Sequence, residues 1–165
     1  MPYQRSWKIC YGCTGLWFST DGKDTGGKCQ NPLGKHDAIG ANIFYELYYF
    51  GAETKSDYSG AVQENWRCCK KCKVLFFNGN SSASFCHDGG SHDSTGSKNY
   101  ILDHQRYAYK NGKRLFVNFR WCCKCQQICT VDWLVSLHFI CPHQKGATHK
   151  IIESGYYAVD EDKWI

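Results

Sequence analysis

The chain has 165 residues, of which 42% are hydrophobic, 16% aromatic and 21% charged. This length and composition fit one globular domain or a few very small ones, and they exclude a disordered chain or a coiled coil. No apolar run reaches the roughly 18 residues of a membrane helix, and the N-terminus lacks the apolar stretch of a signal peptide. We therefore expect a chain without a membrane span that is cytoplasmic, or exported without a classical signal peptide.

Twelve cysteines in a chain without a secretion signal indicate metal ligands or reactive thiols, because the cytosol keeps thiols reduced. Nine of them recur in a pattern that is repeated three times: an aromatic residue, Cys-x-x-Cys, an aliphatic residue, a further Cys 14 to 16 residues on, and then His. Each copy closes on Tyr-x-aliphatic. The pattern predicts three repeats, at 1–60, 61–113 and 114–165, that together form one compact unit.

A Cys-x-x-Cys turn presents two thiolates at the spacing of a tetrahedral metal site, and a later Cys and His complete a Cys3His set that suits Zn²⁺. A closed site of this kind supplies folding energy rather than catalysis, which a repeat of about 40 residues needs because it cannot build an adequate core alone. The predicted ligands of three structural Zn²⁺ ions are Cys10, Cys13, Cys29 and His36; Cys69, Cys72, Cys86 and His92; and Cys122, Cys125, Cys141 and His149.

Several ligand positions have competitors nearby. These are Cys123 beside Cys122, His87 before His92, and His143 two residues after Cys141. A disulfide network between repeats is the alternative to zinc, but it needs an oxidising compartment.

Three cysteines lie outside the pattern. Cys129 takes the place that Trp17 and Phe76 have in the other repeats, so we expect a small buried side chain there. Cys68 and Cys123 could be spare ligands, a disulfide, or neither.

Apolar residues cluster in short β-type runs without a sustained helical period. Leu75–Phe77 ends at Asn78-Gly79, a hairpin-type turn, and Asn111-Gly112 is the strongest short hairpin signal in the chain. Alternating apolar residues over 131–139 predict a half-buried strand in the third repeat. We expect a mainly β, loop-rich chain of three tandem zinc-stapled β modules, either packed around a pseudo-threefold axis or strung in a row.

The second repeat contains Trp66-Arg-Cys-Cys69-Lys-Lys-Cys72-Lys-Val-Leu75-Phe-Phe77, then Cys86, Gly89-Gly90-Ser-His92-Asp93 and Gly96-Ser-Lys-Asn99-Tyr100. This string resembles a tandem repeat of microbial, often exported proteins, a family of uncertain function. The resemblance covers most of the second repeat, the shared skeleton of the first, and the ligand skeleton plus Arg120-Trp121-Cys122 of the third. Because such repeats occur alone or attached to hydrolases, the resemblance implies an accessory binding role.

Small repeated β modules favour a non-enzymatic carbohydrate-binding, lectin-like protein, because equivalent shallow sites give avidity for a glycan. Aromatic faces stack on sugar C–H surfaces, while Asp and Asn bind hydroxyl groups. The third repeat lacks the Asp and the large aromatic residue, so we expect two sites. The same residue types could instead orient zinc ligands, shape turns or fill the core. The predicted ligand-binding residues are Trp17, Asp37, Asn42, Tyr45, Phe76, Asp93, Asn99 and Tyr100.

Two other binding functions are alternatives. The Trp-x-x-Cys-x-x-Cys pattern resembles nucleic-acid-binding zinc ribbons, and the formal net charge of +5 is compatible with such a partner. However, the basic residues lie in short scattered clusters, and three filled Cys3His sites of about −1 each lower the charge to roughly +2. The strand within 131–140 could instead pair with another chain and form a homo-oligomer. The basic clusters are Lys70, Lys71 and Lys73, and Lys110, Lys113 and Arg114.

No enzyme is expected. Cys86-His87-Asp88 holds nucleophile-like residue types, but Cys86 belongs to the ligand pattern and neighbours in sequence do not form a catalytic triad. The chain contains no Gly-rich phosphate loop, nucleophile elbow or metalloprotease helix.

Overall fold

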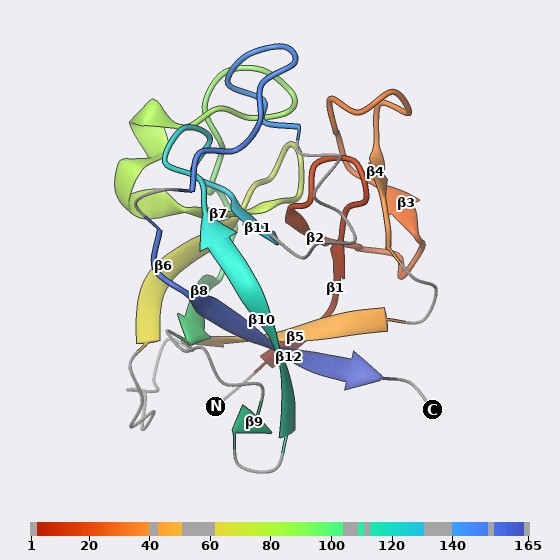
Figure 1. Ribbon diagram of the computed structural model, residues 1–165, viewed down its shortest axis with the longest axis vertical. Coiled ribbons are helices and arrows are strands. Elements are labelled where there is room, and N and C mark those ends of the chain that lie inside the picture. The colour runs from red at the N-terminus through yellow and green to blue at the C-terminus, as the bar shows by residue number, and fades with distance from the viewer. Residues whose placement is uncertain are drawn as a thin grey trace.

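The computed structural model describes residues 3–39, 43–50, 62–103, 109–110, 113–130, 140–151 and 154–163. Within these residues the only helical element is the 3-10 helix η1 (Asn78–Ala83). The chain is mainly β and loop-rich, as the sequence predicts (Figure 1). The strands are β1 (Tyr3–Ile9), β2 (Leu16–Phe18), β3 (Thr25–Gly26), β4 (His36–Asp37), β5 (Ile43–Phe50), β6 (Val62–Cys68), β7 (Leu75–Phe77), β8 (Asn99–Asp103), β9 (Tyr109–Lys110), β10 (Lys113–Trp121), β11 (Ile128–Thr130) and β12 (Tyr157–Lys163).

Each module contains three strands that pair in the same arrangement. A long strand forms an antiparallel hairpin with the short strand that follows Cys-x-x-Cys: β1 with β2, β6 with β7, and β10 with β11. The long strand also pairs antiparallel with the Tyr-x-aliphatic strand of its own module: β1 with β5, β6 with β8, and β10 with β12. The metal-ligand turn is therefore the turn of the hairpin.

The long strand of each module carries a bulge just before its buried aromatic residue. In the first two modules the bulge includes Ser6 and Asn65, both with φ of 71°. A bulge redirects the side chains that follow it, and here the aromatic residue is fully buried in every module. The register shifts lie between Gln4 and Trp7, Gln63 and Trp66, and Phe116 and Phe119.

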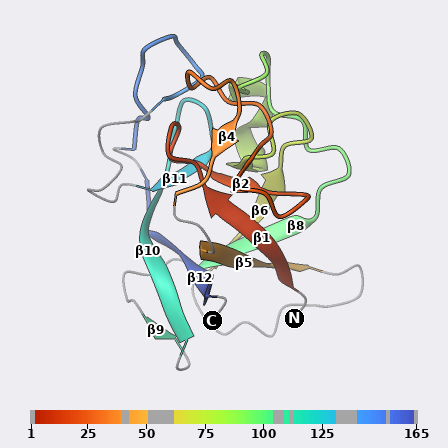
Figure 2. The ribbon, with the colours of Figure 1, turned by 90° about the vertical axis from the view of Figure 1, so that its right-hand side faces the viewer.

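The three Tyr-x-aliphatic strands pair with one another and form a triangle, which lies in the lower centre of Figure 1. Figure 2 shows β1 and β10 leading from this region to the loops that carry the cysteines. Every strand of the triangle contacts both others, so the modules pack around a pseudo-threefold axis rather than in a row. The pairs at its corners are Tyr48 with Ile101, Asp103 with Ala158, and Asp160 with Glu46.

A second ring of contacts joins the hairpins. The backbone N–H of Phe18 donates to the Lys73 carbonyl at 2.9 Å, that of Phe77 to Gln126 at 2.8 Å, and that of Thr130 to Thr14 at 2.9 Å. Each acceptor directly follows the second Cys of a Cys-x-x-Cys and has a left-handed backbone. The ring thus runs from module 1 to 2, from 2 to 3, and from 3 back to 1. The φ values are 60° at Thr14, 68° at Lys73 and 68° at Gln126.

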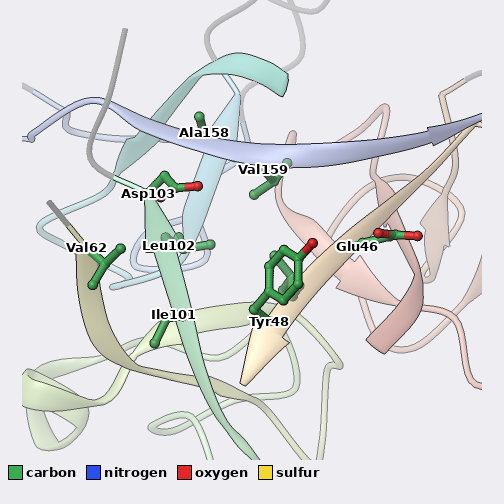
Figure 3. A pocket seen from close by; sticks show the side chains of 9 residues that line it. Glu46, Tyr48, Val62, Ile101, Leu102, Asp103, Ala158 and Val159 are labelled. Carbon is green, nitrogen blue, oxygen red and sulfur yellow. The ribbon is translucent and has the colours of Figure 1, made fainter. Parts of the chain in front are cut away.

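The main core includes the residues that recur in the repeat. Its buried members include Trp7, Leu16, Tyr45, Leu47, Trp66, Leu75, Tyr100, Leu102, Phe119, Ile128, Tyr157 and Val159. A small pocket lies where the triangle closes (Figure 3), and Leu102 and Val159 project toward its centre. The buried carboxylate of Glu46 at this level accepts from Arg5 Nε at 3.1 Å.

Two expected turns have different outcomes. The prediction of a hairpin turn at Asn78-Gly79 is wrong, because β7 already pairs with the preceding strand β6 and the chain continues at Asn78 into η1. At the other site Lys110 lies opposite Lys113 in an antiparallel pair, as a hairpin turn at 111–112 predicts. Residues 111–112 themselves, and the strand expected over 131–139 with its proposed role in oligomerisation, lie outside the described residues.

Candidate metal centres

The structure brings the twelve predicted ligands together in three buried groups of four. Within each group the candidate ligand atoms all lie within 4.8 Å of one another. The groups contain Cys122 rather than Cys123, His92 rather than His87, and His149 rather than His143. At each ambiguous position the spacing of the repeat therefore selected the residue that lies in the cluster.

Distances within the groups fit a tetrahedral metal and not a disulfide. The first and third cysteines are separated by 4.0 Å between Sγ atoms in module 1 and by 3.8 Å in modules 2 and 3. The second cysteine lies 3.6, 3.5 and 3.4 Å from the histidine Nδ1 in the three modules. A disulfide requires about 2.05 Å, whereas Zn–S bonds of about 2.3 Å imply edges of about 3.8 Å between sulfurs and 3.5 Å from sulfur to nitrogen. All twelve cysteines are free thiols.

The Cys-x-x-Cys turn is shaped by backbone hydrogen bonds that repeat in every module. In module 1 the Cys10 N–H donates to the Gly15 carbonyl and the Thr14 N–H to the Cys10 carbonyl, both at 2.9 Å. Equivalent bonds link Cys69 with Val74 and Lys73, and Cys122 with Gln127 and Gln126. The polypeptide itself therefore directs both thiols of the turn toward one point.

Within each cluster, the pKa values of the first and second cysteine thiols are shifted in opposite directions. Hydrogen bonds from the other two thiols, chiefly the second, lower the pKa of the first cysteine, which is Cys10, Cys69 or Cys122. Burial raises the pKa of the second, which is Cys13, Cys72 or Cys125. Hydrogen bonding to the first cysteine raises the pKa of Cys29 to about 12 and that of Cys86 to about 11. Several thiolates at such a site need a cation to stabilise them.

The histidines differ in what their outer ring nitrogen contacts. With Nδ1 facing the thiols, Nε2 carries the proton and can donate. His36 Nε2 donates to the Cys72 carbonyl in module 2, and His149 Nε2 donates to the Cys13 carbonyl in module 1, both at 2.8 Å. His92 Nε2 is buried and has no hydrogen-bond partner among the described residues. Such outer contacts orient a ligand ring, so two of the three centres are tied to a neighbouring module.

The aromatic residues predicted to bind sugar are buried. Trp17 stacks on His36 with ring centroids 5.3 Å apart, and Phe76 stacks on His92 at 4.6 Å. Their exposed fractions are 1% and 0%, and those of Tyr45 and Tyr100 are 5% and 3%. A sugar ring cannot reach any of these faces in this structure.

The polar residues of the same prediction hydrogen-bond within the protein. Asp93 Oδ1 accepts from the Thr95 N–H at 2.9 Å and the Asp93 N–H contacts Cys69 Sγ at 3.4 Å. Asn99 Oδ1 accepts from the Asn65 N–H at the bulge, at 2.8 Å. The Asp37 carbonyl accepts from Tyr11, and Asn42 lies outside the described residues. These contacts are typical of residues that shape turns and support the residues of the Cys3His clusters.

The cysteines outside the pattern do not pair. Cys129 is fully buried, as expected, whereas Cys68 and Cys123 are partly exposed, and all three are free. Burial raises the pKa of Cys68 to about 12.

Sequence reasoning missed a polar contact between the three modules. The Gln30 N–H of module 1 donates to His87 Nδ1 of module 2, and His87 Nε2 lies 3.1 Å from Gln127 Oε1 of module 3. Burial lowers the pKa of His87 to about 3, so the ring is neutral at physiological pH. Only the position of His87 directly after a metal ligand set it apart in the sequence.

The fold and its centres define a class of protein: an all-β chain of three modules, each with a Cys3His cluster suited to a metal. No protein-family model matches this chain, and neither a curated protein nor a solved structure is significantly similar to it. Among the described residues, no helix is long and apolar enough to cross a membrane.

Proposed function

We propose that each Cys3His cluster binds one Zn²⁺ and that the three ions are structural. The proposal is supported by the donor set, since three thiolates and an imidazole suit zinc, and by the burial of all nine cysteine ligands. Four protein ligands complete a tetrahedron, so no position stays open for water or substrate. Zinc bound in this way contributes to folding and not to catalysis.

Native mass spectrometry with and without a chelator tests this proposal. We expect three zinc ions per chain and a mass that corresponds to reduced cysteines. A mass lower by six or more hydrogens, without zinc, would show disulfides instead and overturn the proposal.

We propose further that the protein is a non-enzymatic carbohydrate-binding protein. The observation that carries this proposal is a groove in which two partly exposed aromatic rings, Phe77 and Trp121, adjoin the amide side chains of Gln63 and Asn80. Aromatic faces with neighbouring amides are the groups that bind sugar rings and their hydroxyls. These residues differ from those expected from the sequence, whose aromatic members are buried.

Nucleic-acid binding has weaker support. Lys71 Nζ donates to the Gly89 carbonyl of its own module at 2.7 Å, and Lys8 is buried with its Nζ 2.6 Å from Asp24 Oδ1. None of the described residues that line the aromatic groove is charged. Lys71 of the predicted clusters, and Lys8 outside them, therefore have partners unrelated to phosphate.

A printed glycan array, together with titrations of single-stranded RNA and DNA at two salt concentrations, separates the two functions. Carbohydrate binding should hardly respond to salt, whereas binding to phosphates weakens steeply as salt is added. Binding of nucleic acid with a steep salt dependence, and of no glycan, would overturn the carbohydrate proposal.

A further inference from the structure

The groove between modules 2 and 3 is a separate structural feature from the metal centres. Its residues come from β6, β7 and η1 of module 2 and from β10, β12 and the residues before β12 in module 3. Its cavity volume is about 190 Å³. This volume is smaller than the roughly 300–1,000 Å³ of sites for drug-sized ligands, so the groove suits a ligand no larger than a single sugar residue. The lining residues are Gln63, Phe77, Asn80, Trp121, Gly155 and Tyr157.

We propose that this groove is the carbohydrate-binding site and that it holds one uncharged sugar residue. This inference rests on the proposed carbohydrate-binding function. It also predicts one site per chain, at the contact between two modules, instead of one site within each of the first two repeats.

The two aromatic walls are held in place by their own modules. Phe77 packs against the buried Trp66 with ring centroids 5.6 Å apart. Trp121 Nε1 donates to Gln126 Oε1 at 3.1 Å, and the Trp121 N–H donates to Ser154 Oγ at 2.7 Å. Both rings are partly exposed. Rings fixed before binding lose little conformational entropy when a ligand arrives.

The polar groups of the groove suit neighbouring hydroxyls. Gln63 Oε1 accepts from the Tyr157 hydroxyl at 2.7 Å, which fixes the amide, and Gln63 Nε2 has no hydrogen-bond partner among the described residues. Asn80 is exposed and its Nδ2 reaches Gln126 Oε1 only at 3.4 Å. An amide group both donates and accepts, as a sugar hydroxyl does. Because none of the lining residues that the structure describes is charged, a neutral sugar fits better than an acidic or phosphorylated one.

The pseudo-threefold relation explains why this site occurs once. At the contact between modules 1 and 2, Phe18 takes the place of Phe77, but Cys68 replaces Trp121 and Lys98 replaces Gly155. Lys98 Nζ lies over the Tyr49 ring, 4.4 Å from its centroid. This contact therefore lacks the second aromatic wall and has a charged side chain in place of a glycine.

The contact between modules 3 and 1 lacks both walls. Thr130 and Ile9 occupy the positions of Phe77 and Trp121, and both are buried. Neither residue can present an aromatic face to a sugar.

The experiment uses the whole zinc-loaded chain and a printed array of neutral oligosaccharides. The oligosaccharide that gives the strongest signal is then titrated by isothermal titration calorimetry, which needs no tryptophan reporter and therefore also measures binding to the Trp121→Ala chain. The variants are Trp121→Ala, Asn80→Ala and Gly79→Ala, with Phe18→Ala as the matched control at the contact between modules 1 and 2.

Trp121→Ala should weaken binding at least tenfold and Asn80→Ala several-fold, while Phe18→Ala keeps the wild-type affinity. Gly79→Ala removes no lining group, but its Cβ would clash with Phe77 Cε1 and must displace that ring, so it should also weaken binding. Native mass spectrometry with three zinc ions confirms that each variant is folded, and the exposed Asn80 gives a test with little risk to folding.

The outcomes separate the two proposals. Wild-type binding that survives unchanged in Trp121→Ala and Asn80→Ala would overturn the groove as the site and leave carbohydrate binding intact. If the wild-type chain binds no glycan on the array, the carbohydrate-binding function fails, and the sugar site with it.

Discussion

The metal centre of module 2 differs from those of modules 1 and 3 in the surroundings of its histidine. His36 and His149 each donate from Nε2 to a backbone carbonyl of the next module around the ring, whereas His92 Nε2 is buried without a partner among the described residues. The inner distances of the three centres agree within 0.2 Å, from 3.8 to 4.0 Å between sulfurs and from 3.4 to 3.6 Å between Sγ and Nδ1.

This difference separates two structural roles of the cluster histidine, which are to complete the cluster and to contact a neighbouring module. The inner geometry depends on the Cys-x-x-Cys turn, which is identical in its backbone bonds in all modules. The outer contact depends on how neighbouring modules meet, and it makes the same histidine a link between modules. Modules 1 and 3 use this link in addition to the backbone hydrogen bond of their hairpins, whereas module 2 contacts module 3 through the Phe77 backbone, His87 and Asn80.

The largest expected effect comes from removing a metal ligand of module 2. Cys72→Ser should abolish folding of the whole chain and not only of that module, because β8 belongs to the triangle that all modules share. Structural zinc contributes about 10–16 kcal/mol, which is comparable with or exceeds a typical folding free energy of about 5–15 kcal/mol. Circular dichroism and zinc content measure the loss.

Cys68→Ser is the matched control for this variant, since Cys68 is adjacent to a ligand but lies outside the cluster. It should keep three zinc ions and the wild-type spectrum. A Cys72→Ser chain that stays folded with two zinc ions would show that the modules fold independently, and the ring contacts would then be secondary.

The sequence was sufficient for the members of the three Cys3His clusters, because their positions follow from spacing along a single repeat. It was not sufficient for the outer contacts, which join His36 to Cys72 and His149 to Cys13. No local pattern records which carbonyl of another module lies behind a ring. The same reason applies to the groove, where Phe77 and Trp121 come from different modules.

The aromatic residues were misinterpreted for a different physical reason. Trp17 and Phe76 have residue types that suit either a sugar platform or a core, and only burial decides between the two. Both stack on a ligand histidine, where a large ring shields the cluster from water. The bulges at Ser6 and Asn65 were also missed, because neither residue is a glycine although each has a positive φ.

A smaller effect should separate the histidines. His36→Cys and His92→Cys both create four-cysteine sites, which also bind zinc, and both remove a ring that stacks on an aromatic neighbour. Only His36→Cys removes a hydrogen bond to another module. It should therefore lower the free energy of unfolding by about 1 kcal/mol more than His92→Cys does.

Denaturant unfolding of the zinc-loaded variants measures this difference, with the zinc count checked beforehand. His149→Cys should lower the free energy of unfolding by about as much as His36→Cys does, since the Nε2 of His149 also donates to a carbonyl of a neighbouring module. Equal losses for all three variants would mean that the outer hydrogen bonds contribute nothing to the cohesion of the ring.

The smallest effect concerns the triangle, where the modules again differ at one member. Tyr100 and Tyr157 donate to Gln4 and Gln63 of the preceding module, whereas the third module has Phe116 at the position of these glutamines. Burial raises the pKa of Tyr157 to about 12 and also raises that of Tyr100. Because the folded pKa of Tyr157 exceeds the unfolded value of about 10, its contribution to stability is complete below pH 10 and is lost as the pH rises toward 12.

An ultraviolet titration of the phenolate absorbance, with unfolding followed in parallel, tests this dependence. Tyr157→Phe keeps the ring but removes the ionisable hydroxyl and its bond to Gln63. The variant should lose a small part of the stability at neutral pH and show a shallower decline between pH 10 and 12. If the stability of wild type and that of the variant decline in parallel, the loss of stability at alkaline pH originates in other groups. The Tyr157 hydroxyl then does not distinguish this corner of the triangle from the one at Tyr45.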